Sequence, residues 1–151
     1  MTTSSTVQKP VISVPIAERP RDAWWRTGVV LSGVAVLFFV MDAGGKLVAP
    51  DAMIAHTPPL GLPSTAGFYR LVGTILATCT ALYVWPRTAL LGAVLLSGFL
   101  GGAIALNLRA DMPLLSNTLF GAYMGVLVWA GLLLRRPHIA GLLGLALRKG
   151  A

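Results

Sequence analysis

The sequence predicts an all-α integral membrane protein, a four-helix bundle of two antiparallel hairpins followed by a short C-terminal amphipathic helix. The 151-residue chain is 56% hydrophobic, its mean hydropathy is +0.77, and only 11% of its residues are charged. Soluble domains carry about 25% charged residues. Together with several long apolar runs, this composition makes a lipid bilayer the expected surroundings of the chain.

The chain is expected to divide into three parts. These are a disordered cytoplasmic tail at residues 1–22, a four-helix membrane domain at 23–135 and a basic amphipathic tail at 136–151. The first part is rich in Ser, Thr and Pro and lacks the apolar segment of a signal peptide. The last part places leucines beside Arg148 and Lys149, as expected of a helix lying on the inner leaflet.

The four membrane crossings are expected at about 24–46, 67–85, 88–108 and 114–134. The first apolar run, Thr27 to Met41, has only fifteen residues, whereas a hydrocarbon core of roughly 30 Å needs about 20 residues in a helix. The first helix must therefore continue past Asp42, and the equally short second one must reach back to Arg70. The third and fourth runs have 21 residues each and are long enough.

The basic residues are distributed unevenly between the two sides of such a bundle. The side that holds both termini carries nine of them: Lys9, Arg19, Arg21, Arg26, Arg87, Arg135, Arg136, Arg148 and Lys149. The other side carries only Lys46, Arg70 and Arg109. Because Lys and Arg concentrate on the cytoplasmic side, both termini are expected in the cytoplasm. The net charge of +7 is then explained by basic residues that interact with anionic lipid headgroups, and no nucleic-acid partner is expected.

Small residues recur in the third and fourth helices at spacings that favour close helix packing. They are Gly98, Gly101, Gly102, Gly121 and Gly125. In lipid, small side chains let two helix backbones approach closely. The expected contact is between the third and fourth helices, and the alternative is the face of a homodimer.

Polar residues are expected to gather at the end of the bundle opposite the termini. They are Asp42, Lys46, His56, Tyr69, Arg70, Asn107, Arg109, Asp111 and Asn117. Since an unpaired charge inside the hydrocarbon costs at least about 2.5 kcal/mol, Asp42 and Arg70 should form an ion pair. Lys46 is a second partner for Asp42, because residues four apart share a helix face. The cluster is expected to be either a pocket for a small polar head or a proton relay, or else an ion-pair clip between the hairpins.

Neither a metal site nor a cofactor is expected. Cys79 is the only cysteine and lies in an apolar run, and the only two histidines, His56 and His138, are expected on opposite sides of the membrane. The sequence also lacks an HExxH motif and a phosphate-binding glycine loop.

Four segments give the chain a resemblance to a known family. They are FFVMDAGGKL, PPLGLP, YRLVGTILATCTALYVWPRTALLGAVLLSGFLGGAIALNLRADMPL and LFGAYMGVLVWAGLLLRRP. In this order and spacing they look like the DoxX-like family of small four-helix membrane proteins of bacteria, over about residues 28–137. The resemblance implies a bundle in the bacterial cytoplasmic membrane. The wider family takes its name from a subunit of a thiosulfate:quinone oxidoreductase, but the resemblance supplies no catalytic residues.

The expected function is therefore that of a non-catalytic membrane component. It would hold a small lipophilic ligand, such as a quinone or another amphiphile, or serve a membrane oxidoreductase subunit as an accessory. The alternative is a membrane-embedded isomerase or hydrolase that acts on a lipophilic substrate. In that enzyme Asp42 or Asp111 would serve as the acid/base, beside Arg70 or Arg109.

Overall fold

A computed structural model describes residues 21–56 and 61–142. Nearly all of the expected N-terminal tail, as well as Arg148 and Lys149, lies outside the described residues. The elements in chain order are α1 (Arg21–Val48), α2 (Pro50–His56), α3 (Ala66–Val84), α4 (Ala89–Arg109), the π-helical turn η1 (Leu114–Thr118), α5 (Phe120–Arg135) and α6 (Pro137–Leu142). Among the described residues there is no β-strand.

Four of these helical segments are long and apolar enough to cross a membrane. They are Ala23–Val48, Ala66–Val84, Ala89–Arg109 and Leu114–Arg135. α3 begins at Thr65, whose hydroxyl accepts a hydrogen bond from the amide of Phe68 (3.4 Å), as an N-cap residue does. It ends just before Trp85 and Pro86, because proline cannot continue a helix.

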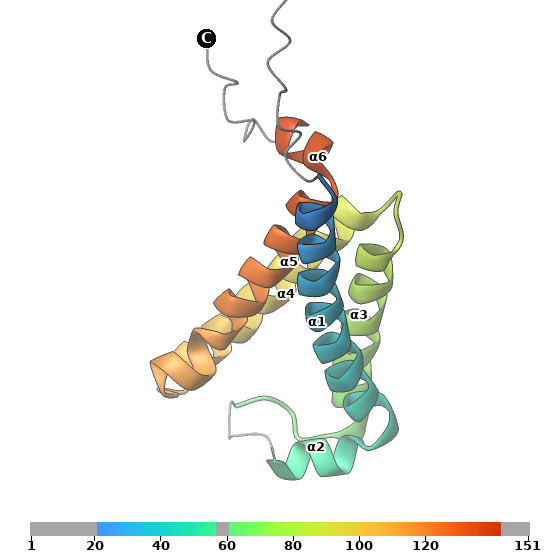
Figure 1. Cartoon of the computed structure of the whole chain (residues 1–151). Coiled ribbons are helices and arrows are strands. Elements are labelled where there is room, and N and C mark those ends of the chain that lie inside the picture. The colour runs from blue at the N-terminus through green and yellow to red at the C-terminus, as the bar shows by residue number, and fades with distance from the viewer. Residues whose placement is uncertain (1–20, 57–60, 143–151) are drawn as a thin grey trace, which may run out of the picture.

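The long helices pack in a ring in which each touches two others. α1 lies against α3 and α5, and α4 also lies against α3 and α5. Figure 1 shows that α4 and α5 lean away from α1 and α3, so that the two pairs diverge from the α6 end of the bundle towards the α2 end. The helices are thus held closely together at one end and are farther apart at the other.

Close backbone contacts hold the α6 end together. A Cβ atom at Gly131 of α5 would lie 2.3 Å from the hydroxyl oxygen of Ser32 on α1, and one at Gly28 would lie 2.8 Å from the Arg135 nitrogen. The side chain of Tyr83 is fully buried between these helices and hydrogen-bonds to Ser32 and to the Val128 carbonyl oxygen, both at 2.9 Å. Small residues and one buried hydroxyl network therefore join α1, α3 and α5.

The glycines expected to pack α4 against α5 fall into two groups. A Cβ at Gly121 would lie 2.8 Å from the Ile104 side chain, so α5 approaches α4 closely at this residue, whereas a Cβ at Gly125 would only reach Leu100 at 4.0 Å. A Cβ at Gly98, Gly101 or Gly102 would meet no atom within 4 Å. The prediction that these three residues contact α5 in the same chain is therefore wrong.

Gly98, Gly101 and Gly102 do not contact α5 because they lie on a different face of α4 from its buried residues. Its buried face consists of Ala89, Gly92, Ala93, Leu96 and Leu100. Gly98, Gly101 and Gly102 lie off this face and are exposed. Spacing alone identifies residues that share a face, but it does not say which neighbour that face meets.

Candidate functional site

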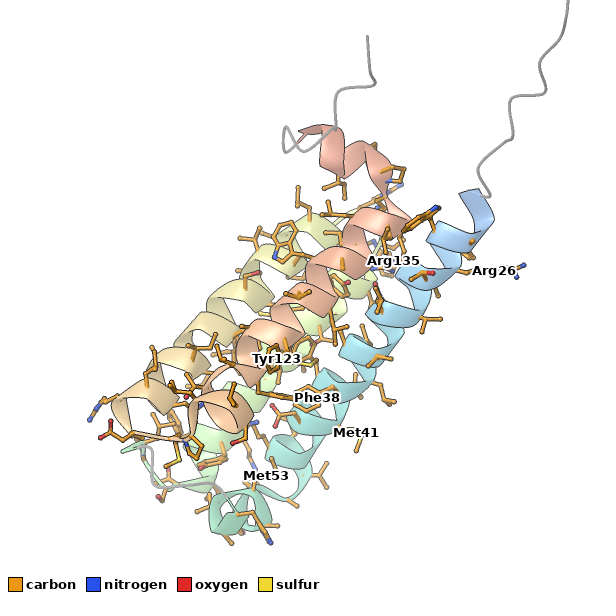
Figure 2. All side chains as sticks on the ribbon, turned by 60° about the vertical axis from the view of Figure 1, so that its left-hand side comes forward. Arg26, Phe38, Met41, Met53, Tyr123 and Arg135 are labelled. Carbon is orange, nitrogen blue, oxygen red and sulfur yellow. The ribbon has the colours of Figure 1, made fainter. Side chains whose placement is uncertain are left out.

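A cavity of about 470 Å³ lies at the α2 end, where the helix pairs diverge. α1, α3 and α4 form its walls, and Met53 of α2 and Leu62 bound it as well. Figure 2 shows Met53 at this end of the molecule, far from Arg135 at the other end. The lining residues are Asp42, Lys46, Met53, Leu62, Phe68, Tyr69, Val72, Gly98, Phe99, Gly102, Ala103, Leu106 and Asn107.

An ion pair lies in the wall of this cavity. The ammonium group of Lys46 contacts the carboxylate of Asp42 one helical turn away on α1. The two side chains are only 16% and 25% exposed, respectively. Because both line the cavity, a bound molecule would meet a carboxylate and an ammonium group side by side.

Tyr69 and Asn107 contribute two further polar groups from the facing helices. Tyr69 is only 7% exposed and lines the cavity, yet among the described residues its hydroxyl has no hydrogen-bond partner. The amide nitrogen of Asn107 donates to the Ala103 carbonyl oxygen (2.9 Å), and within residues 21–56 and 61–142 its amide oxygen has no hydrogen-bond partner. A donor and an acceptor thus remain available to a ligand beside the ion pair.

A second, smaller cavity of about 140 Å³ adjoins the first between α1, α4 and α5. Both cavities are lined by Asp42, Phe99, Ala103 and Asn107, so two of the four polar residues, Asp42 and Asn107, lie at their junction. Phe38 and Phe120 line its other side, with ring centroids 5.0 Å apart in an edge-to-face contact between α1 and α5. Figure 2 shows Phe38 on α1 where that helix faces α5.

The structure brings together only some of the polar residues predicted to form the site. Asp42, Lys46, Tyr69 and Asn107 line the cavity, whereas His56, Arg70, Arg109 and Asp111 are exposed and do not line it. The Nδ1 atom of His56 lies 2.8 Å from the Ala52 carbonyl oxygen. The side chain of Asn117 lies outside the described residues. Among the described residues, no group of three His, Cys, Asp or Glu side chains could hold a metal ion.

The predicted ion pair between Asp42 and Arg70 is not formed, because Asp42 pairs with Lys46 instead. The face that α3 buries contains Tyr69, Gly73, Leu76, Thr80 and Tyr83. Arg70 follows Tyr69 by one residue and is therefore rotated by about 100° around the helix. The tyrosine faces the cavity, and the arginine is exposed on the outside of the bundle.

Several lining residues were not predicted as part of a site. Phe68, Val72, Phe99 and Leu106 have no polar atoms to distinguish them from other apolar residues of a membrane helix. Gly98 and Gly102 stand out in the sequence as small residues, but their spacing predicts helix packing and not a cavity wall. Their spacing of four matches one wall of the cavity as well as it matches a helix contact, and only the arrangement of the neighbouring helices distinguishes the two.

The sequence profile of the DoxX-like family matches residues 30–131. The chain belongs to the DoxX-like family. This match confirms the resemblance carried by the four sequence segments. No curated protein and no solved structure matches the DoxX-like chain.

Proposed function

We propose that this DoxX-like protein binds a small amphiphile in the 470 Å³ cavity at the α2 end of its helix bundle. The ligand's polar head would lie near Asp42, Lys46 and Asn107, and its apolar part would lie against Phe68, Phe99 and their neighbours. The observation that carries the proposal is an ion pair in the wall of an otherwise largely apolar cavity.

The size and chemistry of the cavity support this function. Small-molecule pockets typically enclose about 300–1,000 Å³ and combine apolar walls with a few convergent polar groups. The 470 Å³ cavity is of this kind: aromatic and aliphatic side chains dominate its lining, and four polar side chains contribute. The role we propose is an accessory one, in which the protein supplies the bound amphiphile, a quinone among the candidates, to a membrane oxidoreductase partner.

We further propose that the protein is a bacterial inner-membrane protein of two antiparallel hairpins with both termini in the cytoplasm. The excess of Lys and Arg on the side of the termini supports this orientation. A phosphatase fused after Ala151, a reporter that works only in the periplasm, should be inactive. Full activity of that fusion would contradict the orientation.

A second candidate function is acid/base catalysis on a lipophilic substrate. Asp42 is the carboxylate that lines the cavity among the described residues, and the ammonium group of Lys46 contacts it. A carboxylate positioned in this way can act as a general acid or base. Asp111, the alternative acid/base that the sequence predicts, is exposed and does not line the cavity. If the protein is an enzyme, Asp42→Asn should abolish turnover of the substrate and leave its binding intact. If it is only a binding protein, neither the unmodified protein nor the variant should show turnover.

The binding function is tested by filling the cavity without disturbing the fold. Gly102 lines the cavity and has open space around it, so Gly102→Leu should place its side chain in the cavity without a backbone clash. The full-length protein would be studied in lipid nanodiscs by native mass spectrometry with ubiquinone-1 as the probe. We expect bound ubiquinone-1 to fall at least about tenfold, because the added side chain occupies the volume that the ligand needs.

The neighbouring variant Gly101→Leu is the matched control. Gly101 is also exposed, and a Cβ there also meets no atom within 4 Å, but it does not line the cavity. It should retain the occupancy of the unmodified protein. Equal occupancy in both leucine variants would contradict the proposed binding site.

A further inference from the structure

The polar lining of the cavity carries almost no net charge, and this has consequences for the ligand. Asp42 and Lys46 are the charged residues of that lining, and they contact each other directly. Tyr69 and Asn107 are uncharged. An ionised ligand head would therefore find no unpaired countercharge among these residues.

The same residues suit an uncharged head that forms hydrogen bonds. The Tyr69 side chain is more than nine-tenths buried, lines the cavity and has no hydrogen-bond partner for its hydroxyl among residues 21–56 and 61–142. A hydroxyl can both donate and accept, and the Asn107 amide oxygen can accept. A ligand hydroxyl or carbonyl can therefore form hydrogen bonds with the Tyr69 hydroxyl and the Asn107 amide oxygen.

From this arrangement we infer that the cavity selects amphiphiles with an uncharged hydroxyl or carbonyl head and excludes those with an ionised head. This inference rests on the proposed function and specifies its ligand class. A charged head brought among these apolar walls would lose its hydration without gaining an ion-pair partner, unless it broke the contact between Asp42 and Lys46. The ion pair thus acts as a selectivity element, and Tyr69 recognises the head.

The test compares three probes that share a twelve-carbon chain: 1-dodecanol, dodecanesulfonate and dodecyltrimethylammonium. The full-length protein in phosphatidylcholine nanodiscs would be titrated with each probe, and bound probe would be counted by native mass spectrometry. We expect 1-dodecanol to bind at least about tenfold more tightly than either charged probe, because only the charged heads are buried without a partner.

Two substitutions should change this selectivity in opposite directions. Lys46→Met leaves the Asp42 carboxylate without its partner, so the affinity for dodecyltrimethylammonium should rise at least about tenfold relative to the unmodified protein. Asp42→Asn leaves the Lys46 ammonium group without its partner, so the affinity for dodecanesulfonate should rise in the same way. Comparing each probe with itself across variants cancels its partitioning into the lipid. Arg70→Met is the matched control, since it removes a basic residue from the same end of the bundle without altering the cavity lining.

Tyr69→Phe provides an independent measurement that retains the ring packing. It should weaken the binding of 1-dodecanol about fivefold, as expected for the loss of one neutral hydrogen bond, and leave the affinities for the charged probes unchanged. Equal binding of the three probes, or the same selectivity in Lys46→Met and Arg70→Met, would overturn the inference while leaving the binding function intact. If none of the probes bound to the unmodified protein, the proposed function itself would fail.

Discussion

Gly92→Ala is expected to lower the free energy of unfolding by about 3 kcal/mol, at the upper end of the usual cost of overpacking. A Cβ at Gly92 would lie 2.2 Å from the Tyr83 nitrogen and 2.4 Å from its Cα atom. Both are backbone atoms, so no side-chain rotation can relieve the clash. The turn between α3 and α4 would have to open instead, although the Thr88 hydroxyl fixes it by donating to the Leu82 carbonyl oxygen (2.8 Å).

Gly101→Ala is the control for this prediction, because a Cβ there meets no atom within 4 Å. It should change the stability by no more than about 1 kcal/mol, the difference in helix propensity between glycine and alanine. Unfolding of the two variants in mixed detergent micelles, followed by circular dichroism, measures the difference. Equal stability of the two proteins would show that the backbones of α3 and α4 do not approach each other closely at Gly92.

Tyr83→Ala is expected to lower the free energy of unfolding by about 3–5 kcal/mol, as other large-to-alanine substitutions in a buried core do. Tyr83 is fully buried, and its hydroxyl donates to the Val128 carbonyl oxygen, so Ser32 must be the donor in the Ser32 contact. The guanidinium carbon of Arg135 also lies 5.3 Å from the centre of the tyrosine ring. The substitution would remove a ring, two hydrogen bonds and a cation–π contact at once.

Tyr83→Phe separates the hydroxyl from the ring. It keeps the ring in place and removes only the hydrogen bonds, so it should cost about 1–2 kcal/mol. The same unfolding experiment measures both variants. A Tyr83→Phe variant as unstable as Tyr83→Ala would indicate that the hydroxyl network, and not the packing of the ring, accounts for the stability of the α6 end.

The helical class and the location of the polar cluster could be predicted from the sequence because they depend on composition and on order along the chain. The four apolar runs indicate four spanning helices, and the positions of Asp42, Tyr69 and Asn107 at helix ends place them at one end of the bundle. The contact between Asp42 and Lys46 follows from a spacing of four on one helix.

Contacts between helices could not be predicted in the same way, because they depend on how each helix is rotated about its axis. Tyr69 and Arg70 are adjacent in sequence, but only Tyr69 faces the cavity. The sequence also offers no signal that Tyr83 would meet Ser32, 51 residues earlier in the chain. The same uncertainty about rotation led to the assignment of Gly98 and Gly102 to helix packing.

Photolabelling tests most directly whether the cavity at the α2 end holds an amphiphile from the membrane. A photoactivatable diazirine derivative of 1-dodecanol would be added to the full-length protein in nanodiscs, and labelled residues would be mapped by peptide mass spectrometry. We predict labels on cavity-lining residues such as Val72 and Leu106, removed by excess 1-dodecanol and absent in Gly102→Leu. Labelling that spreads over exposed apolar residues outside the cavity, such as Val30 and Val126, and that excess 1-dodecanol does not reduce, would contradict this prediction.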